Sequence, residues 1–336
     1  MTPVSHDASQ AAIRLFRWAE RIVITTHVQP DGDGIGSEVA LAHWLLAQGK
    51  TVNIVNPHAA PRRFAFLEKD IPAPSFELES AARLLAAADA LAVLDISVPA
   101  RLGPLEPLVR EYAGEIVVID HHLGPTGFRG VDCRDTTASA TAELLHELLV
   151  DWGAEITPEM ATSLYAAISY DTGGFRYSNT TARTHRVAAA LIDAGADTHE
   201  INQRVFESVS PTRARLLSRV FGDFHLEAGG RLAWIALSSD LLEEAGAEPE
   251  DVEGVVEALR SLEHVEMAIL FKEIEKGATK VSLRSLGDVD VAQLAGRFGG
   301  GGHKNAAGAF VRQPMGSVVE EVLAAARESF EVQRVG

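Results

Sequence analysis

The N-terminal half of the chain alternates between two patterns of hydrophobic positions. Short runs rich in apolar and β-branched residues occur at 21–26, 51–55, 90–95 and 116–120. Segments with helical spacing lie between or after them, at 36–48, 80–88, 99–112, 139–152, 158–169 and 181–194. Strands that alternate with helices are typical of a parallel sheet covered on both faces. The pattern therefore predicts an α/β domain with a doubly wound parallel sheet.

A second pattern begins near residue 226. It predicts strands at 231–238, 265–274 and 279–285, helices at 251–262 and 290–298, and a glycine-rich segment after the last helix. This is typical of a smaller α/β domain. We expect a first domain at 1–194, a helical connector at 195–225, which includes one helical stretch at 201–224, and a second domain at 226–336. We also expect a cleft between the two domains.

Several apolar segments of the first domain end in acidic or imidazole side chains. The runs read ITTHVQPDGD, VLD, VIDHH and SYDTGG. Ligands of parallel α/β sheets bind beyond the carboxyl ends of the strands, so these groups should gather there. The groups are His27, Asp31, Asp33, Asp95, Asp120, His121 and Asp171.

So many carboxylates in one crevice repel one another unless a cation lies among them. One aspartate can bridge two divalent ions about 3.5–4 Å apart. Mixed carboxylate and imidazole ligands suit Mn²⁺, Fe²⁺, Co²⁺ or Zn²⁺, and the excess of carboxylates favours Mn²⁺. The alternative is that a single aspartate after a strand caps the next helix, which would suffice for Asp120 or Asp171 alone. Capping does not explain the whole set, so we predict a metal site.

The composition of the chain restricts the kinds of molecules that it can bind. The chain has 336 residues, 46% of them hydrophobic, and a formal net charge of −17. Basic residues occur only singly in the motifs, whereas proteins that bind long nucleic acid need many of them against phosphates. The single cysteine, Cys133, indicates a reducing compartment and is interpreted as core filling rather than a nucleophile. No run approaches the ~20 apolar residues that span a bilayer. We expect a cytoplasmic protein with no membrane partner and no long duplex partner.

Taken together, HVQPDGDGIGS, VLD, DHH, YDTGGFRYSNTT and the late GGGGHKNAAG resemble the DHH/DHHA1 phosphoesterase family over nearly the whole chain. Within it the chain is most similar to the bifunctional oligoribonucleases, or nanoRNases, that also act on 3′-phosphoadenosine 5′-phosphate (pAp). The resemblance implies an N-terminal DHH domain with two Mn²⁺ ions and a C-terminal DHHA1 domain that holds substrate.

The resemblance also implies roles for the residues at the motif positions. His27 and Asp31 would bind one metal ion. Asp33, His121 and Asp171 would bind the other, and Asp95 would bridge the two. Asp120 would support the site, and His122 would face the scissile phosphate and donate a hydrogen bond or a proton to it.

The glycine run and its neighbours are candidates for substrate binding. Consecutive glycines permit positive φ and let backbone N–H groups approach an anion, although a flexible turn is the alternative. An arginine and a hydroxyl precede the run, and both can bind phosphate. The family implies this for Arg284, Gly301, Gly302 and His303. Ser285 is a candidate because its hydroxyl lies next to Arg284 at the predicted strand end. Arg176 is a further candidate; the neighbouring Ser178 and Thr180 are equally well explained as helix caps.

We therefore predict a manganese-dependent phosphodiesterase, an exoribonuclease and 3′(2′),5′-bisphosphate nucleotidase. It would degrade short RNA oligonucleotides to 5′-mononucleotides and pAp to AMP through a metal-bridging hydroxide. The alternative is a phosphodiesterase for cyclic di-AMP or pApA. A RecJ-like exonuclease, a DHH/DHHA2 pyrophosphatase and a non-catalytic nucleotide-binding module fit less well. A homodimer is expected for a protein of this kind.

Overall fold

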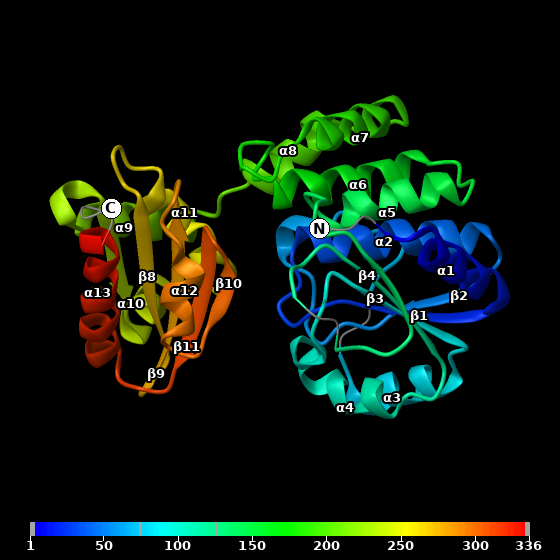
Figure 1. Cartoon of the computed structure of the whole chain (residues 1–336), viewed down its shortest axis with the longest axis horizontal. Coiled ribbons are helices and arrows are strands. Elements are labelled where there is room, and N and C mark those ends of the chain that lie inside the picture. Colours follow the sequence, from blue (N-terminus) through cyan, green and yellow to red (C-terminus); the bar gives the residue numbers. More distant parts are fainter. Residues whose placement is uncertain (1–3, 74–75, 125–126, 333–336) are drawn as a thin grey trace. The chain divides into compact units, whose positions relative to one another are not determined.

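The computed structural model describes residues 4–73, 76–124 and 127–332. The chain forms two compact units, Met1–Ser208 and Val209–Gly336 (Figure 1). The range 195–225 is divided between them. The predicted helical connector at 201–224 consists of two helices, of which α8 (Thr198–Phe206) lies in the first unit and α9 (Pro211–Asp223) in the second. Ser210 caps α9 and Pro211 begins it, so the chain starts a new helix there.

A five-stranded parallel sheet forms the centre of the first unit, which confirms the prediction. Its strands are β1 (Arg21–Thr25), β2 (Thr51–Ile54), β3 (Ala90–Leu94), β4 (Glu115–Asp120) and β5 (Val131–Arg134), in the order β2-β1-β3-β4-β5. Strand β5 was not predicted because it is only four residues long and two of them are charged. All four neighbouring pairs are parallel.

Helices cover both faces of this sheet, as a doubly wound fold requires. One face packs against α1 (His6–Trp18), α2 (Gly32–Ala47), α5 (Thr141–Asp151) and α6 (Pro158–Asp171). The other packs against α3 (Leu78–Ala87), the 3-10 helix Pro99–Leu105 and α4 (Glu106–Glu111). Helix α7 (Ala182–Asp193) packs on α6. Along β1, Ile22 and Ile24 enter the first core and Val23 the second, which is the alternation of a buried strand.

Two helix predictions in this unit are corrected. Helix α2 begins at residue 32 rather than 36, because the Asp31 carboxylate accepts hydrogen bonds from the backbone N–H groups of Asp33 and Gly34. The predicted helix at 99–112 is interrupted. Gly103 has a φ of 55° and Pro104 follows it, so a 3-10 segment precedes the short α4.

The second unit is built on a six-stranded mixed sheet of order β10-β11-β9-β8-β7-β6. Its strands are β6 (His225–Glu227), β7 (Leu232–Leu237), β8 (Met267–Glu275), β9 (Ala278–Ser285), β10 (Gly301–His303) and β11 (Ala306–Val311). Its other helices are α10 (Ser239–Ala245), α11 (Val255–Arg260), α12 (Val291–Gly296) and α13 (Met315–Val332). Strands β6, β10 and β11 and helices α10 and α13 were missed by the sequence pattern, whereas the α/β class is confirmed.

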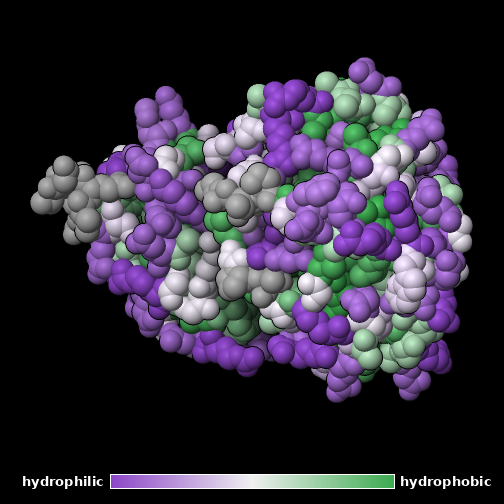
Figure 2. All heavy atoms as spheres, turned by 45° about the vertical axis from the view of Figure 1, so that its right-hand side comes forward, coloured by the Kyte–Doolittle hydropathy of each residue, from purple (hydrophilic) through white to green (hydrophobic). Residues whose placement is uncertain are grey.

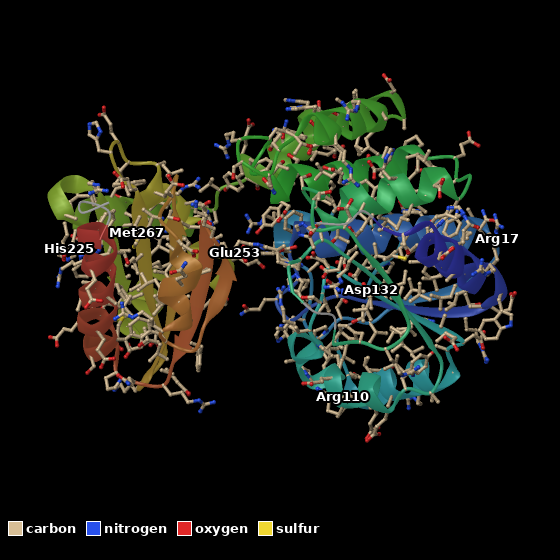
Figure 3. All side chains as sticks on the ribbon, in the orientation of Figure 1. Arg17, Arg110, Asp132, His225, Glu253 and Met267 are labelled. Atoms are coloured by element: carbon tan, nitrogen blue, oxygen red, sulfur yellow. The ribbon has the colours of Figure 1, made fainter. Side chains whose placement is uncertain are left out.

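Side chains of the second sheet also divide between two cores. Met267 of β8, labelled in Figure 3, lies in the core that α12 and α13 cover, and the next residue, Ala268, lies in the core that α9 and α11 cover. The surface seen in Figure 2 is mostly hydrophilic, with small hydrophobic areas. In the part of the chain that the structure describes, no helix is both long and apolar enough to cross a membrane.

Candidate metal centre and active site

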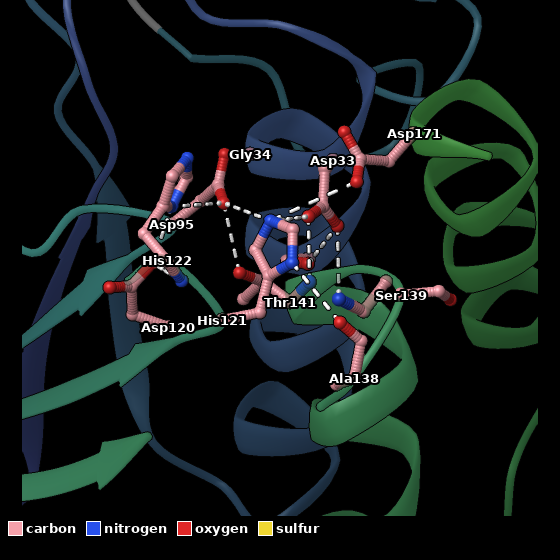
Figure 4. Close-up of polar contacts among 12 residues, drawn as sticks. Asp33, Gly34, Asp95, Asp120, His121, His122, Ala138, Ser139, Thr141 and Asp171 are labelled. Atoms are coloured by element: carbon pink, nitrogen blue, oxygen red, sulfur yellow. Dashed lines mark hydrogen bonds and ion pairs between the residues drawn. The ribbon is translucent and has the colours of Figure 1, made fainter. Parts of the chain in front are cut away.

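The site lies at the point where the strand order of the first sheet reverses. From β1 the chain first adds β2 on one side and then β3 on the other, so a crevice opens at the carboxyl ends of β1 and β3. His27 follows β1 by two residues and Asp95 follows β3 directly. The third contribution comes from β4, which ends at Asp120 and delivers His121 and His122. The strand order itself therefore brings these motifs together (Figure 4).

The first set of possible metal ligands contains His27, Asp31 and Asp95. The His27 Nε2 lies 3.4 Å from Asp95 Oδ2 and 3.8 Å from Asp31 Oδ1. The other ring nitrogen, Nδ1, lies 2.8 Å from the Val28 carbonyl oxygen and donates to it, which directs Nε2 toward the carboxylates. This Nε2 is buried and has no hydrogen-bond partner among the described residues. An unpaired imidazole nitrogen facing two carboxylates fits a metal ligand.

The second set contains Asp33, His121 and Asp171. The His121 Nε2 lies 3.7 Å from Asp33 Oδ2 and 3.8 Å from Asp171 Oδ2. It also lies 3.6 Å from Asp95 Oδ1. In each set the possible ligand atoms lie within 4.8 Å of one another, close enough to hold one metal ion. The structure thus brings together all six residues that the sequence predicted as ligands.

Asp95 connects the two sets. Its Oδ2 faces His27 and its Oδ1 faces His121, so one carboxylate has an oxygen in each. Its backbone has a φ of 60°, a left-handed conformation that an aspartate adopts rarely. That conformation costs about 1–3 kcal/mol and persists only where the surrounding structure fixes it. The Asp95 position is consistent with a bridging carboxylate.

The charges of the site support the same interpretation. Burial first, and then the charge of Asp95, raises the pKa of Asp33 well above its usual value. Burial also raises the pKa of Asp171, to about 6. Burial alone would lower the pKa of the imidazoles, but the carboxylates outweigh it and raise the pKa to about 10 for His27 and about 9 for His121. The pocket therefore attracts positive charge, which metal ions would supply in place of protons.

His122 and Asp120 form a pair beside the two ligand sets, and His122 could also join Asp95 and His121 in a third set, because its Nδ1 lies 3.5 Å from Asp95 Oδ1. The His122 Nδ1 lies 2.7 Å from Asp120 Oδ1, and the same oxygen accepts the His122 backbone N–H at 3.2 Å. Asp120 is fully buried. A buried carboxylate that binds Nδ1 fixes both the ring orientation and the tautomer with the proton on Nδ1. Asp120 thus positions the imidazole of His122.

Three residues that contact the predicted ligands, Thr141, Ala142 and Asn179, were not predicted from the sequence. The Thr141 hydroxyl donates to Asp95 Oδ1 at 2.9 Å, and the backbone N–H groups of Thr141 and Ala142 donate to Asp33. The Asn179 amide donates to the Asp171 carbonyl oxygen at 3.2 Å. The signal for Thr141 was weak, because Thr at the start of a predicted helix ordinarily suggests capping. Only the tertiary fold places the N-terminus of α5 against the site.

In the second unit, two residues predicted to bind substrate, Arg284 and Ser285, form hydrogen bonds within the protein. Arg284 on β9 is half-buried, and its Nε donates to Glu257 Oε1 of α11 at 2.7 Å. The Ser285 hydroxyl is buried, donates to the Val289 carbonyl oxygen at 2.6 Å and accepts from the Asn305 amide at 3.0 Å. Ser285 thus joins β9 to the segment after β10. Its contact with substrate stays a prediction.

The glycine run is partly a strand rather than a loop. Gly301, Gly302 and His303 form β10, are exposed and pair with β11. A side chain at Gly302 would place its Cβ 2.4 Å from the Ala306 carbonyl oxygen, and the φ of Gly302 is 143°. These glycines therefore allow the two backbones to approach closely, a reason that the sequence interpretation did not include.

Two further expectations concern single residues. Arg176 is exposed and its Nε donates to the Gly173 carbonyl oxygen in its own turn. The cap of the helix that follows is Thr181, so neither Ser178 nor Thr180 caps it. Cys133 is buried, and burial, with the charge of Asp132, raises its thiol pKa to about 12. A thiol that stays protonated is a poor nucleophile, in line with its interpretation as core filling.

The fold defines an α/β protein in which carboxylates and imidazoles gather at the sheet's switch point, in positions that could hold metal ions. Residues 21–168 match the DHH family, N-terminal domain, and residues 233–331 match the DHHA1 domain. The chain belongs to the DHH family and carries a DHHA1 domain.

Particular relatives narrow the resemblance. The chain is 35% identical to the bifunctional oligoribonuclease and PAP phosphatase NrnA of Thermus thermophilus, over 94% of this chain and 91% of that protein. It is 29% identical to the cyclic-di-AMP phosphodiesterase GdpP of Geobacillus thermodenitrificans, over 96% of this chain but 50% of that protein. Among solved structures, an exopolyphosphatase-related protein from Bacteroides fragilis matches with a TM-score of 0.89 and 29% identity, over 98% of this chain and 97% of that one.

Proposed function

We propose that this protein is a manganese-dependent phosphodiesterase that hydrolyses short oligoribonucleotides to 5′-mononucleotides and pAp to AMP. The observation that carries the proposal is the Asp95 carboxylate, which faces His27 with one oxygen and His121 with the other. The name of the Thermus thermophilus relative supplies the two substrates. The similarity extends over 91% of that relative, which supports a shared activity rather than one shared domain.

The proposed metal ligands form two groups that share one residue. His27 and Asp31 would hold one divalent ion, Asp33, His121 and Asp171 a second, and Asp95 both. Four carboxylates and two imidazoles favour Mn²⁺ over softer metals. Such ions lower the pKa of bound water and neutralise phosphate oxygens when they are present.

His122 would act on the departing oxygen. Hydrolysis forms a bond from water oxygen to phosphorus and breaks the bond between phosphorus and the ribose 3′-oxygen. That oxygen leaves with a negative charge unless it gains a proton. His122, oriented by Asp120, would donate this proton or a hydrogen bond to the developing charge. Both proposed substrates contain a phosphorus to 3′-oxygen bond, so one site serves the oligonucleotide and pAp.

The second unit would bind the substrate's phosphates through Arg284 and β10. A guanidinium on a strand can bind a phosphate with two parallel hydrogen bonds, and the backbone at Gly301 and Gly302 is exposed for further contacts. We include His303, Ser285 and Arg176 in the proposed set on the strength of the motif alone. Homodimer formation and a cytoplasmic location stay predictions.

A product assay tests the proposal. The protein is stripped with chelator, supplied with Mn²⁺ and given pAp, pApA, a 5-mer RNA, a 24-mer RNA or cyclic di-AMP. AMP from pAp, pApA and the 5-mer, with slow cleavage of the 24-mer, is the expected result. Lack of turnover of every substrate with Mn²⁺, Mg²⁺, Co²⁺ and Zn²⁺ would falsify the proposal.

The second candidate is a phosphodiesterase for cyclic di-AMP or pApA. The 29% identity to GdpP over 96% of this chain favours it as the alternative. Its requirement is the same metal site, so the site alone does not separate the two. In the assay above, reaction of cyclic di-AMP and pApA without reaction of pAp and the 5-mer would establish this alternative.

A further inference from the structure

One face of the second sheet is not covered by the described helices toward one end of strand β9. Val281 and Leu283 of β9 are buried in the core beneath α12 and α13. Side chains alternate along a strand, so Lys280, Ser282 and Arg284 point to the opposite face. Near Arg284 that face is covered by α11, which supplies Glu257. At the Lys280 end of the strand, Lys280 and the neighbouring Phe310 are exposed, so the described residues of this unit leave this part of the face open.

The strand register places three residues of this face in one row. Lys280 of β9 is opposite Phe310 of β11 on one side and opposite Lys272 of β8 on the other. Phe310 is 50% exposed. The guanidinium of Arg312 lies 5.9 Å from the centre of the Phe310 ring. The sequence showed only scattered basic residues here. The hairpin and the β9–β11 pairing bring them together.

The two lysines of the row form no ion pair with an acid among the described residues. Lys50 and Lys304, by contrast, bind Glu20 and Asp288. Lys272 is half-buried, and burial, followed by the charge of Lys280, lowers its pKa. Two neighbouring lysines without an acidic partner repel each other. An anion bound there relieves this repulsion.

We propose that the row Phe310–Lys280–Lys272 is a further subsite for the nucleotides of a short single-stranded oligoribonucleotide that extend beyond Arg284. This inference rests on the proposed function and adds a determinant of substrate length to it. The lysines would contact phosphates and the Phe310 ring would stack on a base. Aromatic rings beside cationic groups bind single strands in this way without reading their sequence.

The spacing explains why length matters. Lys280 and Arg284 are four residues apart on one strand, a separation of about 13 Å at ~3.3 Å per residue. The residues between them on this face, Ser282 and its β11 partner Gly308, are small and leave room for a chain. A pAp molecule held at Arg284 needs no contact with the row, whereas a 5-mer that follows β9 reaches it.

The test compares two substrates in two variants. Lys272→Gln/Lys280→Gln and Phe310→Ala are assayed with pAp and with a 5-mer RNA under Mn²⁺. For Phe310→Ala, removal of one stacking interaction predicts a fall of about 5- to 150-fold in kcat/KM for the 5-mer. For the double lysine variant, the slope of log KM for the 5-mer against log salt should decrease by about 0.7 for each phosphate that the two lysines neutralise in the original protein. Turnover of pAp should stay within about twofold of the original protein.

A control variant and a binding assay distinguish failure of the subsite proposal from failure of the proposed function. Lys276→Gln removes an exposed lysine from the β8–β9 turn, outside the row, and should leave both substrates unchanged. Equal losses for pAp and the 5-mer, or none for the 5-mer, overturn the subsite. If the original protein hydrolyses neither substrate, the proposed function fails. Fluorescence anisotropy with a labelled 5-mer in chelator then decides the subsite alone, because tighter binding by the original protein than by the double variant supports it and equal binding overturns it.

Discussion

The two units of this protein concentrate opposite charges in opposite ways. In the first, four carboxylates and two imidazoles converge in a buried crevice at the ends of parallel strands. In the second, two lysines that form no ion pair among the described residues lie on the partly open face of a mixed sheet. Strand ends converge on a point and suit small ions, whereas a sheet face spreads groups along a line and suits an extended polyanion. A net charge of −17 therefore does not exclude a nucleic-acid substrate of a few nucleotides.

The largest effect is expected at the residue shared by both ligand sets. Asp95→Asn keeps the shape of the side chain and its hydrogen bond from Thr141, but removes the negative charge that both sets share. We expect loss of measurable turnover and a lower content of bound Mn²⁺ per chain, measured by elemental mass spectrometry.

A matched control for Asp95→Asn is Asp132→Asn. Asp132 pairs with Arg134 on the edge strand β5, outside both ligand sets. This variant should retain both turnover and metal content. Normal turnover by Asp95→Asn would show that the carboxylate is not a bridge.

Much of the site was predictable because its chemistry is local to the sequence. His27, Asp95 and His121 follow apolar strands, and parallel strands bring their ends to one edge whatever the details of packing. Asp33 instead lies in the first turn of α2, and Asp171 ends α6. Thr141 was missed because its role depends on where α5 meets the sheet. Lys272 and Lys280 were missed as a pair because their proximity depends on hairpin register. Short strands such as β5 and β10 also escaped, since three or four residues carry little periodicity.

The second largest effect tests Thr141, which supports the first unit's site without being a proposed ligand. Thr141→Val removes the hydroxyl that donates to Asp95 and keeps the side-chain shape. Groups that orient metal ligands typically contribute about 10- to 100-fold to metal affinity. We expect the Mn²⁺ concentration for half-maximal activity to rise by that factor.

Thr141→Ser distinguishes the hydroxyl from packing. It keeps the donor and should restore most of the metal affinity. If the serine variant is as impaired as the valine variant, the methyl group rather than the hydrogen bond matters, and Thr141 has a packing role.

A third prediction concerns the pairing of Arg284 with Glu257 in the second unit. Arg284→Ala should raise KM for pAp by about 10- to 150-fold, because a hydrogen bond to a charged group contributes about 1.5–3 kcal/mol. Glu257→Gln should lower KM, since it removes the carboxylate that competes with the substrate phosphate for the guanidinium. A higher KM in Glu257→Gln would mean that the pair instead holds Arg284 in its binding orientation.

The smallest effect is expected at Ser285, where a substitution tests whether the hydroxyl stabilises β9 or contacts the substrate. The Ser285 hydroxyl is buried between Val289 and Asn305, whereas Ser282, three residues earlier, is half-buried on the open face. Ser285→Ala leaves the buried carbonyl oxygen of Val289 without its donor and should cost about 1–3 kcal/mol of local stability, seen as faster amide hydrogen exchange in β9 and β11. Its KM for pAp should change little if the hydroxyl only joins β9 to the segment after β10. Ser282→Ala should leave the exchange unchanged. A large rise in KM for Ser285→Ala with unchanged exchange would reverse this assignment and restore Ser285 as a substrate contact.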